Sequence, residues 1–416
     1  KMIHNNPFLS KTFIKKWLSH FLDDQKEVSF NLFPDLNFFK SAKKLVYINT
    51  AKTNTKGITY TIAKEESNTS LKKTFLIYDV HTFFNTPSVL NNSRYKIKKT
   101  IQYPGYLCEL ENFLSVKEYM QKRLSKNSNY KFNLYKRKLE HSFDIRYNMY
   151  YGAITKEKYN SLFSAFKKLL IKRFNDKQET NNNLDPKEWD FYFDVTYPML
   201  LEKKAALFVT YNKETPIAIT LLNFSDTIAF DTIRVFDIDY SPFRLGTTSI
   251  IKQLDWCIAN GIKFLDFSKG YYEYKERWAT TTYNFEYHIV YDSKSIVSKI
   301  TMHITLLFFN FKNYLRDKNI HKKFHQLTFA LKNNIKKTEK TVPVKNNTTP
   351  VKENLKEISI FNTENANLLK YVYDFLYKKS EKLNDVRLYK ITNQQNYYYI
   401  KGLQNVTTFM AYNLEE

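Results

Sequence analysis

The sequence contains little cysteine and glycine and lacks the short motifs of several enzyme classes. Its two cysteines, Cys108 and Cys257, are far apart and have apolar neighbours, so neither a disulfide framework nor a zinc site with paired cysteines is available. Only 7 glycines occur, which disfavours a dinucleotide-binding fold. No G-x-x-x-x-G-K-[ST] loop, G-x-S-x-G elbow or H-E-x-x-H pair is present. P-loop NTPases, α/β-hydrolases and metalloproteases of these types are excluded, and we expect no metal.

Long apolar runs are also lacking. The most apolar stretch, residues 304–311, is far shorter than the about 20 residues that a membrane-spanning helix needs. The polar opening, residues 1–7, has no secretory apolar core. We therefore expect a reducing, cytoplasmic setting, which leaves room for a peripheral position at the inner face of the membrane.

What the chain does have is basic charge and aromatic bulk. An excess of 65 Lys+Arg over 41 Asp+Glu gives a net charge of +24, which favours an anionic partner such as a nucleotide cofactor, RNA or an acidic membrane surface. AT-biased coding explains much of this lysine equally well. With 43% hydrophobic residues, including 34 Phe and 32 Tyr, the chain can bury a large core. Its length of 416 residues allows two or three domains.

Apolar periodicity predicts a first unit over residues 1–150. It comprises a helix, short strands and a basic helical segment, at residues 10–24, 45–50, 57–63, 74–78 and 115–147. The cations of the basic segment face either a phosphate-bearing ligand or solvent.

A second unit is predicted over residues 151–337. Helices at 156–174 and 189–201 precede an antiparallel meander at 205–211, 217–224 and 227–236. A helix ending near residue 259, strands at 262–267 and 284–291, and two helices between 293 and 337 follow. Residues 338–357 have the composition of a linker. The remaining module, 358–416, carries a helix at 365–383 and strands at 387–392 and 397–401.

A phosphate site is predicted where the meander leads into a helix. Gly246 lets the backbone approach a ligand closely, and the amides of Thr247, Thr248 and Ser249 open a helix whose dipole favours phosphate. Arg244 can add a charge-assisted hydrogen bond. The alternative is an ordinary glycine turn with threonines at the helix start.

The same region resembles the GNAT superfamily of acyltransferases, in its FemAB-like branch, which includes acetyltransferases associated with bacterial cellulose synthesis. The resemblance rests on the order of elements, on Asp239–Gly246, on Asn260-Gly261 and on Asp266-Phe267-Ser268-Lys269-Gly270 followed by Tyr274-Lys275. It covers roughly residues 5–330. It implies an α+β protein with tandem GNAT-like halves, a helical extension and a small C-terminal α/β module.

The resemblance also implies an activity, namely transfer of an acyl group from acetyl-CoA or another acyl-CoA to an amino or hydroxyl acceptor. The family's phosphate loop usually reads Q/R-x-x-G-x-G/A, whereas Phe243 and Thr248 depart from that pattern here. An aminoacyl-tRNA donor, as in related peptidoglycan-bridge enzymes, therefore stays open. So do a non-catalytic basic protein that binds RNA or an anionic surface, and a GNAT scaffold that has lost its chemistry.

Acyl transfer from a thioester needs a base and oxyanion stabilisation. Asp266 is the predicted base or orienting residue, unless it merely caps the turn that follows it. Lys275 can hold an anionic part of either substrate, and Tyr274 or Tyr272 can return a proton to the leaving thiolate. Lys269 completes the predicted substrate contacts.

Overall fold

Two sheets carry the fold in this computed structural model, which describes residues 2–22, 27–41, 45–63, 71–84, 94–318 and 352–411. The larger has the strand order β1-β2-β3-β4-β11-β5-β10-β9-β8-β7-β6, and the smaller β12-β13-β14-β15. The strands are β1 (Val28–Ser29), β2 (Asn37–Lys40), β3 (Val46–Asn49), β4 (Thr74–His81), β5 (Tyr95–Glu109), β6 (Ile145–Tyr150), β7 (Ala205–Asn212), β8 (Thr215–Phe224), β9 (Ile228–Phe236), β10 (Phe264–Lys269), β11 (Thr281–Asp292), β12 (Leu355–Ile358), β13 (Arg387–Ile391), β14 (Tyr397–Lys401) and β15 (Val406–Met410).

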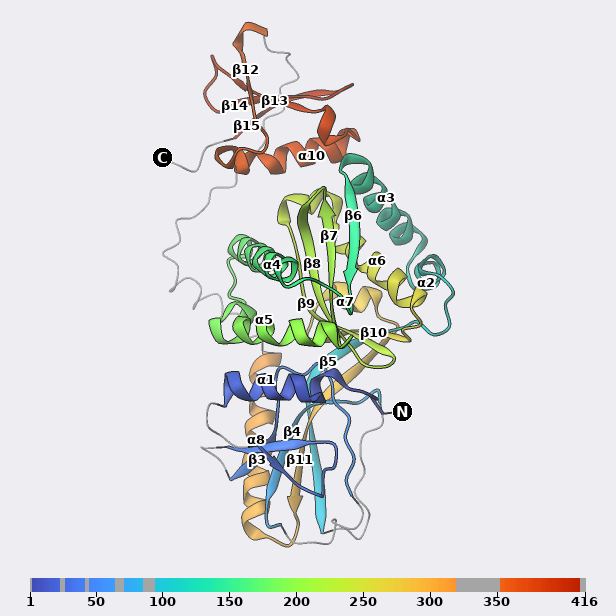
Figure 1. Cartoon of the computed structure of the whole chain (residues 1–416), viewed down its shortest axis with the longest axis vertical. Helices are drawn as coiled ribbons and strands as arrows, with labels where there is room; N and C mark the ends of the chain where they lie inside the picture. The colour runs from blue at the N-terminus through green and yellow to red at the C-terminus, as the bar shows by residue number, and fades with distance from the viewer. Residues whose placement is uncertain are drawn as a thin grey trace.

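Helices cover both faces of the larger sheet, so the predicted α+β class is confirmed (Figure 1). The α-helices are α1 (Lys11–Phe21), α2 (Val116–Arg123), α3 (Lys126–Ser142), α4 (Lys156–Lys177), α5 (Pro186–Leu201), α6 (Leu245–Ala259), α7 (Glu273–Trp278), α8 (Ile296–Asp317) and α10 (Leu369–Lys379). The short 3-10 helices are η1 (Pro7–Leu9), η3 (Asn182–Leu184), η4 (Ile238–Phe243), η5 (Lys352–Asn354), η6 (Thr363–Leu368) and η7 (Leu383–Asp385).

The first half of the large sheet consists of β1 to β5 together with β11. Strands β3 and β4 run parallel, whereas β11 lies between β4 and β5 and is antiparallel to both. Helix α8 packs on β11 and β5, and α1 packs against α5 of the other half. Strand β11 follows the second half in sequence but joins the first half in space (Figure 1).

Strand β5 joins the two halves into one sheet. It is 15 residues long and pairs with β11 over most of its length and with β10 near its end. At Gly105 the ring of Tyr283 crosses the strand so closely that a Cβ would lie 2.3 Å from it. Only glycine permits that crossing, because real Cβ contacts are much longer.

The second half is the meander β7-β8-β9, flanked by β6 on one side and by β10 on the other. Helix α4 packs on β8 and β9 on one face, while α6 packs on β8, β9 and β10 on the opposite face. Apolar side chains of α4 recur at three- and four-residue spacing, and the Thr155 hydroxyl caps the helix by accepting from the Lys158 amide. Periodicity and capping therefore explain the predicted helix.

The C-terminal module is a four-stranded antiparallel sheet with α10 beside it. Helix α10 docks on the second half through a shared apolar cluster in which Tyr373 packs against Phe143 and Tyr240. The small α/β module expected from the sequence is therefore present.

Some local expectations differ from the structure. Residues 57–63 do not form the predicted strand. They contact β4 through a single isolated bridge between Ile58 and Val80. The basic segment 115–147 contains two helices and the start of β6, which pairs with β7 of the second half. Residues 355–357, at the end of the expected linker, belong to strand β12, which pairs with β13. Residues 319–351, with the second predicted helix, lie outside the described residues.

Candidate active site

The parallel strands β9 and β10 separate within a few residues of the point where they meet. They pair only as Phe264↔Ile228, Leu265↔Ala229 and Asp266↔Phe230. Strand β10 then changes course, because Ser268 takes a left-handed backbone conformation (φ 58°) and the register with β5 shifts between Asp266 and Lys269. Side chains beyond these positions face a gap instead of a neighbouring strand.

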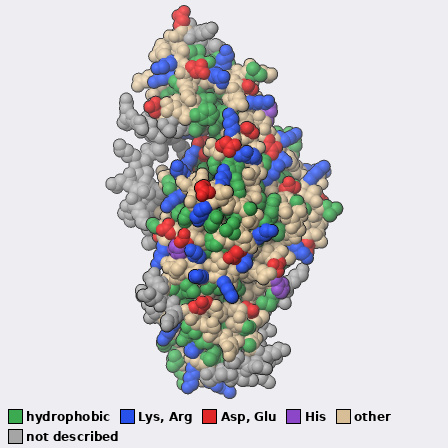
Figure 2. All heavy atoms as spheres, viewed as in Figure 1, with side chains coloured by type: hydrophobic (Ala, Val, Ile, Leu, Met, Phe, Trp, Pro, Cys, Tyr) green, Lys and Arg blue, Asp and Glu red, His purple; other side chains and the backbone are tan. Residues whose placement is uncertain are grey.

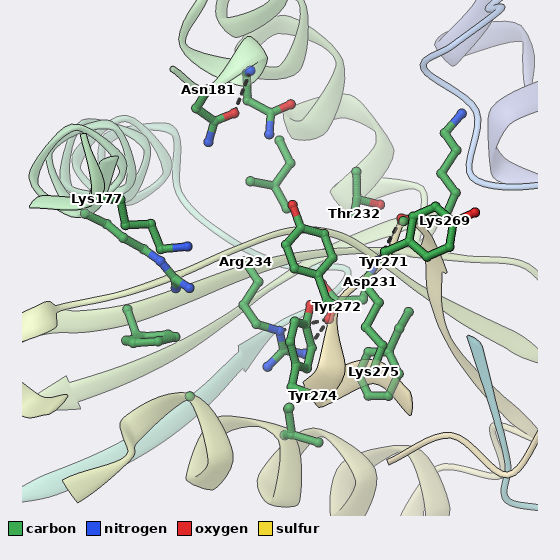
Figure 3. A pocket seen from close by; sticks show the side chains of 18 of the residues that line it. Lys177, Asn181, Asp231, Thr232, Arg234, Lys269, Tyr271, Tyr272, Tyr274 and Lys275 are labelled. Atoms are coloured by element: carbon green, nitrogen blue, oxygen red, sulfur yellow. Dashed lines mark hydrogen bonds and ion pairs between the residues drawn. The ribbon is translucent and has the colours of Figure 1, made fainter. Parts of the chain in front are cut away.

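This gap is a cavity of about 1290 Å³. Its walls come from β9, β10, α7 and the start of α6, with α4 and the loop after it on the far side, where Lys177 and Asn181 lie (Figure 3). Two acidic side chains line it, Glu179 and Asp231. Nine basic ones do so: Lys56, Arg173, Lys177, Arg234, Arg244, Lys269, Lys275, Arg277 and Arg316. This excess of positive charge favours an anionic ligand.

Helix α6 begins at the cavity without a side-chain cap. Arg244 precedes it with a left-handed backbone (φ 51°) and makes no capping hydrogen bond. Gly246 and Thr247 of the first turn line the cavity together with Arg244. The amides of Thr247 and Thr248 donate to the carbonyl of Arg244, so the amides left to bind a phosphate at this end are those of Leu245 and Gly246.

Gly246 also serves packing. A Cβ at this position would lie 2.7 Å from the ring of Phe236 on β9. The guanidinium of Arg173 lies over the same ring, 4.0 Å from its centroid. Glycine therefore allows α6 to lie close to β9, in addition to the ligand approach that the sequence suggested.

The side chains of Thr248 and Ser249 do not line the cavity. Both side chains are buried, and the Ser249 hydroxyl accepts a hydrogen bond from the amide of Gln253. Of the five residues predicted to surround donor phosphates, the structure brings Arg244, Gly246 and Thr247 to the cavity. Thr248 and Ser249 are buried and are not among the residues that line it.

Lys275 and Tyr274 lie at the β10 end of the cavity (Figure 3). The Lys275 side chain is 6% exposed, and its Nζ donates to the carbonyl oxygens of Lys269 (2.8 Å) and Ser268 (3.4 Å). Burial lowers the pKa of Lys275 to about 8. Burial raises the pKa of Tyr274, so its phenol keeps its proton at neutral pH.

Lys269 and Tyr272 complete the predicted set at this end. Lys269 reaches into the first half, where its Nζ forms a 2.6 Å ion pair with the buried carboxylate of Asp79. Burial lowers the pKa of Lys269. Tyr272 is 57% exposed, and the Lys275 ammonium lies 5.1 Å from its ring centroid. Tyr272 therefore lies at the rim of the cavity.

The helix N-terminus beside this cavity lies where the sequence predicted a phosphate site. Residues 129–276 match the acetyltransferase (GNAT) domain family. The match begins in α3 and ends in α7, so it includes β9, β10 and α6 around the cavity. The predicted GNAT domain is thereby confirmed, and the chain carries an acyltransferase domain in this general sense.

The solved structures that match the chain are distant from it in sequence. A conserved protein of unknown function from Bacteroides thetaiotaomicron is 13% identical, with a TM-score of 0.46 over 70% of this chain and 93% of the other. FemX is 10% identical (TM-score 0.44, 68% and 92%). A tandem GNAT protein from the clavulanic acid biosynthesis pathway is 6% identical (TM-score 0.34, 61% and 77%). No curated protein sequence matches the chain.

Asp266 of the GNAT domain does not line the cavity. Its carboxylate is fully buried and accepts hydrogen bonds from His81 Nε2 (2.9 Å), the Tyr283 hydroxyl (2.7 Å) and the Ser268 amide (2.6 Å). Burial lowers the pKa of His81, which therefore stays neutral. A carboxylate held by three donors and shut off from the cavity does not fit the predicted role of base. It fits the alternative, in which Asp266 caps the turn after β10.

Sequence reasoning missed the carboxylate that the GNAT domain does present to the cavity, Asp231. It forms an ion pair with Arg234, whose Nε lies 2.9 Å from Asp231 Oδ2. A β-bulge puts both on one side of β9, because Leu221 pairs with Ile233 and Leu222 with Asp231, leaving Thr232 unpaired. Two charged residues in an otherwise apolar predicted strand were the available signal.

Lys56 was missed as well. It comes from the first half, lines the cavity and has its pKa lowered by burial. Nothing in its local sequence marks it, because only the joining of the two halves through β5 brings it there.

The described ranges hold no group of three or more His, Cys, Asp or Glu arranged for a metal ion. Among the helices that can be described, none has both the length and the apolar character needed to cross a bilayer.

Proposed function

We propose that this protein transfers an acyl group from acetyl-CoA, or another acyl-CoA, to an amino or hydroxyl group of an acceptor bound in the cavity between β9 and β10. The observation that carries the proposal is this cavity, which joins an uncapped helix N-terminus at one end to the partly titrating amine of Lys275 at the other. The match of residues 129–276 to the GNAT family supports the same reaction class.

The donor site is assigned to the start of α6. A pyrophosphate there would accept from the amides of Leu245 and Gly246 and from the guanidinium of Arg244. Arg173, which faces the same space from α4, supplies further positive charge. The thioester would then extend along the opened strands toward Lys275.

Lys275 is assigned to the carbonyl oxygen of the donor. As the acceptor attacks the carbonyl carbon, negative charge develops on that oxygen, and an ammonium held by two backbone carbonyls stabilises it without having to reorganise. The carbon–sulfur bond then breaks, and CoA leaves as a thiolate. Tyr274 contributes a hydrogen bond rather than a proton, because its raised pKa makes it a weaker acid than a thiol.

Asp231 is assigned as the proton acceptor. One carboxylate oxygen is bound by Arg234, while the other has no hydrogen-bond partner among the described residues and faces the cavity side of β9. It takes the proton of the attacking amine or hydroxyl and returns it to the thiolate, so the cycle is balanced in protons. Asp266 acts behind it as a positioning residue, through the turn whose carbonyls hold Lys275.

Calorimetric titration with CoA and acetyl-CoA at two salt concentrations tests the proposal. Saturable binding that survives the higher salt supports it, and Arg244→Gln should weaken that binding. Arg146→Gln is the matched control, because Arg146 forms an exposed ion pair with Glu214. Absence of CoA binding at either salt would overturn the acyl-CoA assignment.

An aminoacyl-tRNA donor is the second candidate. The positive lining favours it, since cations continue from β10 across to Lys177 on α4 (Figure 3). The two donors differ in their salt dependence, because each phosphate contact made by a nucleic acid releases counterions. Tight tRNA binding that weakens steeply with salt, without CoA binding, would select this donor.

Affiliation with the branch associated with cellulose synthesis, and a cytoplasmic location, rest on the sequence motifs and composition alone.

A further inference from the structure

The outward face of helix α8 is apolar. Of the twenty large hydrophobic side chains that are exposed in the described part of the chain, eight lie on this helix: Ile296, Val297, Ile300, Ile304, Leu307, Phe308, Phe311 and Tyr314. Their spacing of three and four residues places them on one side of the helix, opposite the side that packs on the sheet. A surface helix of a soluble domain normally shows the reverse pattern.

The orientation of α8 is fixed by its inner face. Met302 and Phe309 are buried against the first half, and the Phe309 ring stacks on Tyr287 of β11 with centroids 3.9 Å apart. The Asn313 side-chain amide donates to the backbone carbonyl of Ile101 on β5, and the Asn310 side-chain oxygen accepts from the Thr100 hydroxyl. The exposed apolar face is thus a property of a well-anchored helix, because rotating it would break these contacts.

Positive charge borders the apolar face. Lys294, Lys299, Lys312 and Lys318 are exposed at its ends and along its two edges. From residue 293 to residue 318 the sequence has one acidic residue, Asp317. Figure 1 shows α8 along one side of the lower part of the molecule. Hydrophobic and Lys or Arg side chains occur together in that part of Figure 2.

We propose that the outer face of α8 is a membrane-binding surface that lies in the headgroup region of an anionic bilayer. An interfacial helix combines these two features: apolar side chains that enter the acyl boundary and lysines that meet lipid phosphates. A second copy of the chain is a poorer occupant. In a two-fold contact the same lysines of both copies would meet with no carboxylates along the apolar face to pair with them.

Co-sedimentation of the full chain with lipid vesicles tests this proposal, without any acyl donor. The probes are vesicles of phosphatidylcholine alone and of phosphatidylcholine mixed with phosphatidylglycerol. The test variant is Leu307→Asp combined with Phe311→Asp. The control is Leu114→Asp combined with Leu403→Asp, which adds the same charge at positions that are at least as exposed but lie outside α8.

We expect the wild-type chain and the control to bind the anionic vesicles, more weakly at high salt, and the α8 variant to bind about tenfold less or not at all. Equal thermal unfolding of the two variants would show that the fold is kept. Failure of the wild type to bind anionic vesicles would overturn the proposal, as would undiminished binding by the α8 variant. A wild-type dimer that the α8 variant dissociates, with no vesicle binding, would assign the face to self-association instead.

Discussion

The two halves of the large sheet each contain one parallel strand pair, but the space beside the pair is used differently. In the second half, β9 and β10 separate and leave a cavity lined by lysine and arginine. In the first half, β3 and β4 pair over three positions, and the chain itself then fills the place beside β4. Ile58 bridges Val80 there, accepts from the His81 amide and donates to the Asp79 carbonyl.

The filling of the first half is aromatic and apolar. Ile58 and Tyr60 are buried in a cluster that includes Phe33 and Phe75, whose ring centroids are 4.8 Å apart. The same strand arrangement therefore gives a packed core in one half and a ligand-sized space in the other. The difference lies in the side chains and in one short segment of chain, not in the topology.

If the open half is the catalytic one, Lys275→Met should have the largest effect. This substitution removes the ammonium that we propose stabilises the oxyanion, so it should lower kcat about 100- to 1000-fold. The fold should survive, because methionine suits a site where the ammonium is disfavoured by burial. Lys263→Met is the matched control, since Lys263 forms an exposed ion pair with Glu111 outside the cavity. Steady-state kinetics measure the effect, and an unchanged kcat would remove Lys275 from the mechanism.

The pH dependence of turnover tests the same role of Lys275. The pKa of Lys275 is lowered to about 8, so its ammonium form is present below that pH and lost above it. Turnover should therefore fall as the pH rises through about 8. Lys275→Arg keeps its charge throughout this range, so whatever activity it retains should not show that fall. A wild-type profile that keeps rising beyond this pH would contradict the assigned role.

Asp231→Asn should lower kcat about 100-fold while leaving donor affinity nearly unchanged, because the carboxylate is assigned to the proton and not to donor phosphates. Single-turnover kinetics and calorimetry separate the two quantities. Asp226→Asn, at an exposed turn, is the control. If both variants are equally active, the base lies elsewhere.

A larger side chain at the start of α6, beside the cavity of the second half, should have a smaller effect. Gly246→Val places side-chain atoms against the Phe236 ring, so α6 must shift. We expect donor affinity to fall about tenfold and the free energy of unfolding to fall by about 1–3 kcal/mol. Adding Phe236→Leu should recover part of both losses. Wild-type affinity in the single variant would place the phosphates elsewhere.

The filled half should respond in stability and not in binding. Ile58→Ala removes a fully buried side chain and should lower the free energy of unfolding by about 2–4 kcal/mol. Donor affinity, measured on the folded variant, should stay near the wild-type value. Denaturant unfolding and calorimetry together test this, and a large loss of affinity would mean that the packing around Ile58 also shapes the binding cavity.

Much of the second half was predictable from the sequence. Apolar runs of strand length joined by turn residues identify the meander, a period of 3.6 residues identifies helix α4, and the turn after β10 has a recognisable motif. Partners remote in sequence were not predictable. The role of Asp266 depends on His81, 185 residues away, and Lys56 reaches the cavity only in the assembled sheet. Asp231 was hidden by a bulge, which strict alternation along a strand cannot anticipate.

The position of β11 has a consequence for the order in which the chain can fold. Strands β4 and β5 are made early during synthesis, but the strand that lies between them is residues 281–292, which appears only after the whole meander. Until then, both strands have unpaired edges, which are prone to pairing wrongly. The second half likewise needs β5 from the first. Neither half is therefore an independent folding unit, and cutting the chain near residue 150 should yield two insoluble fragments.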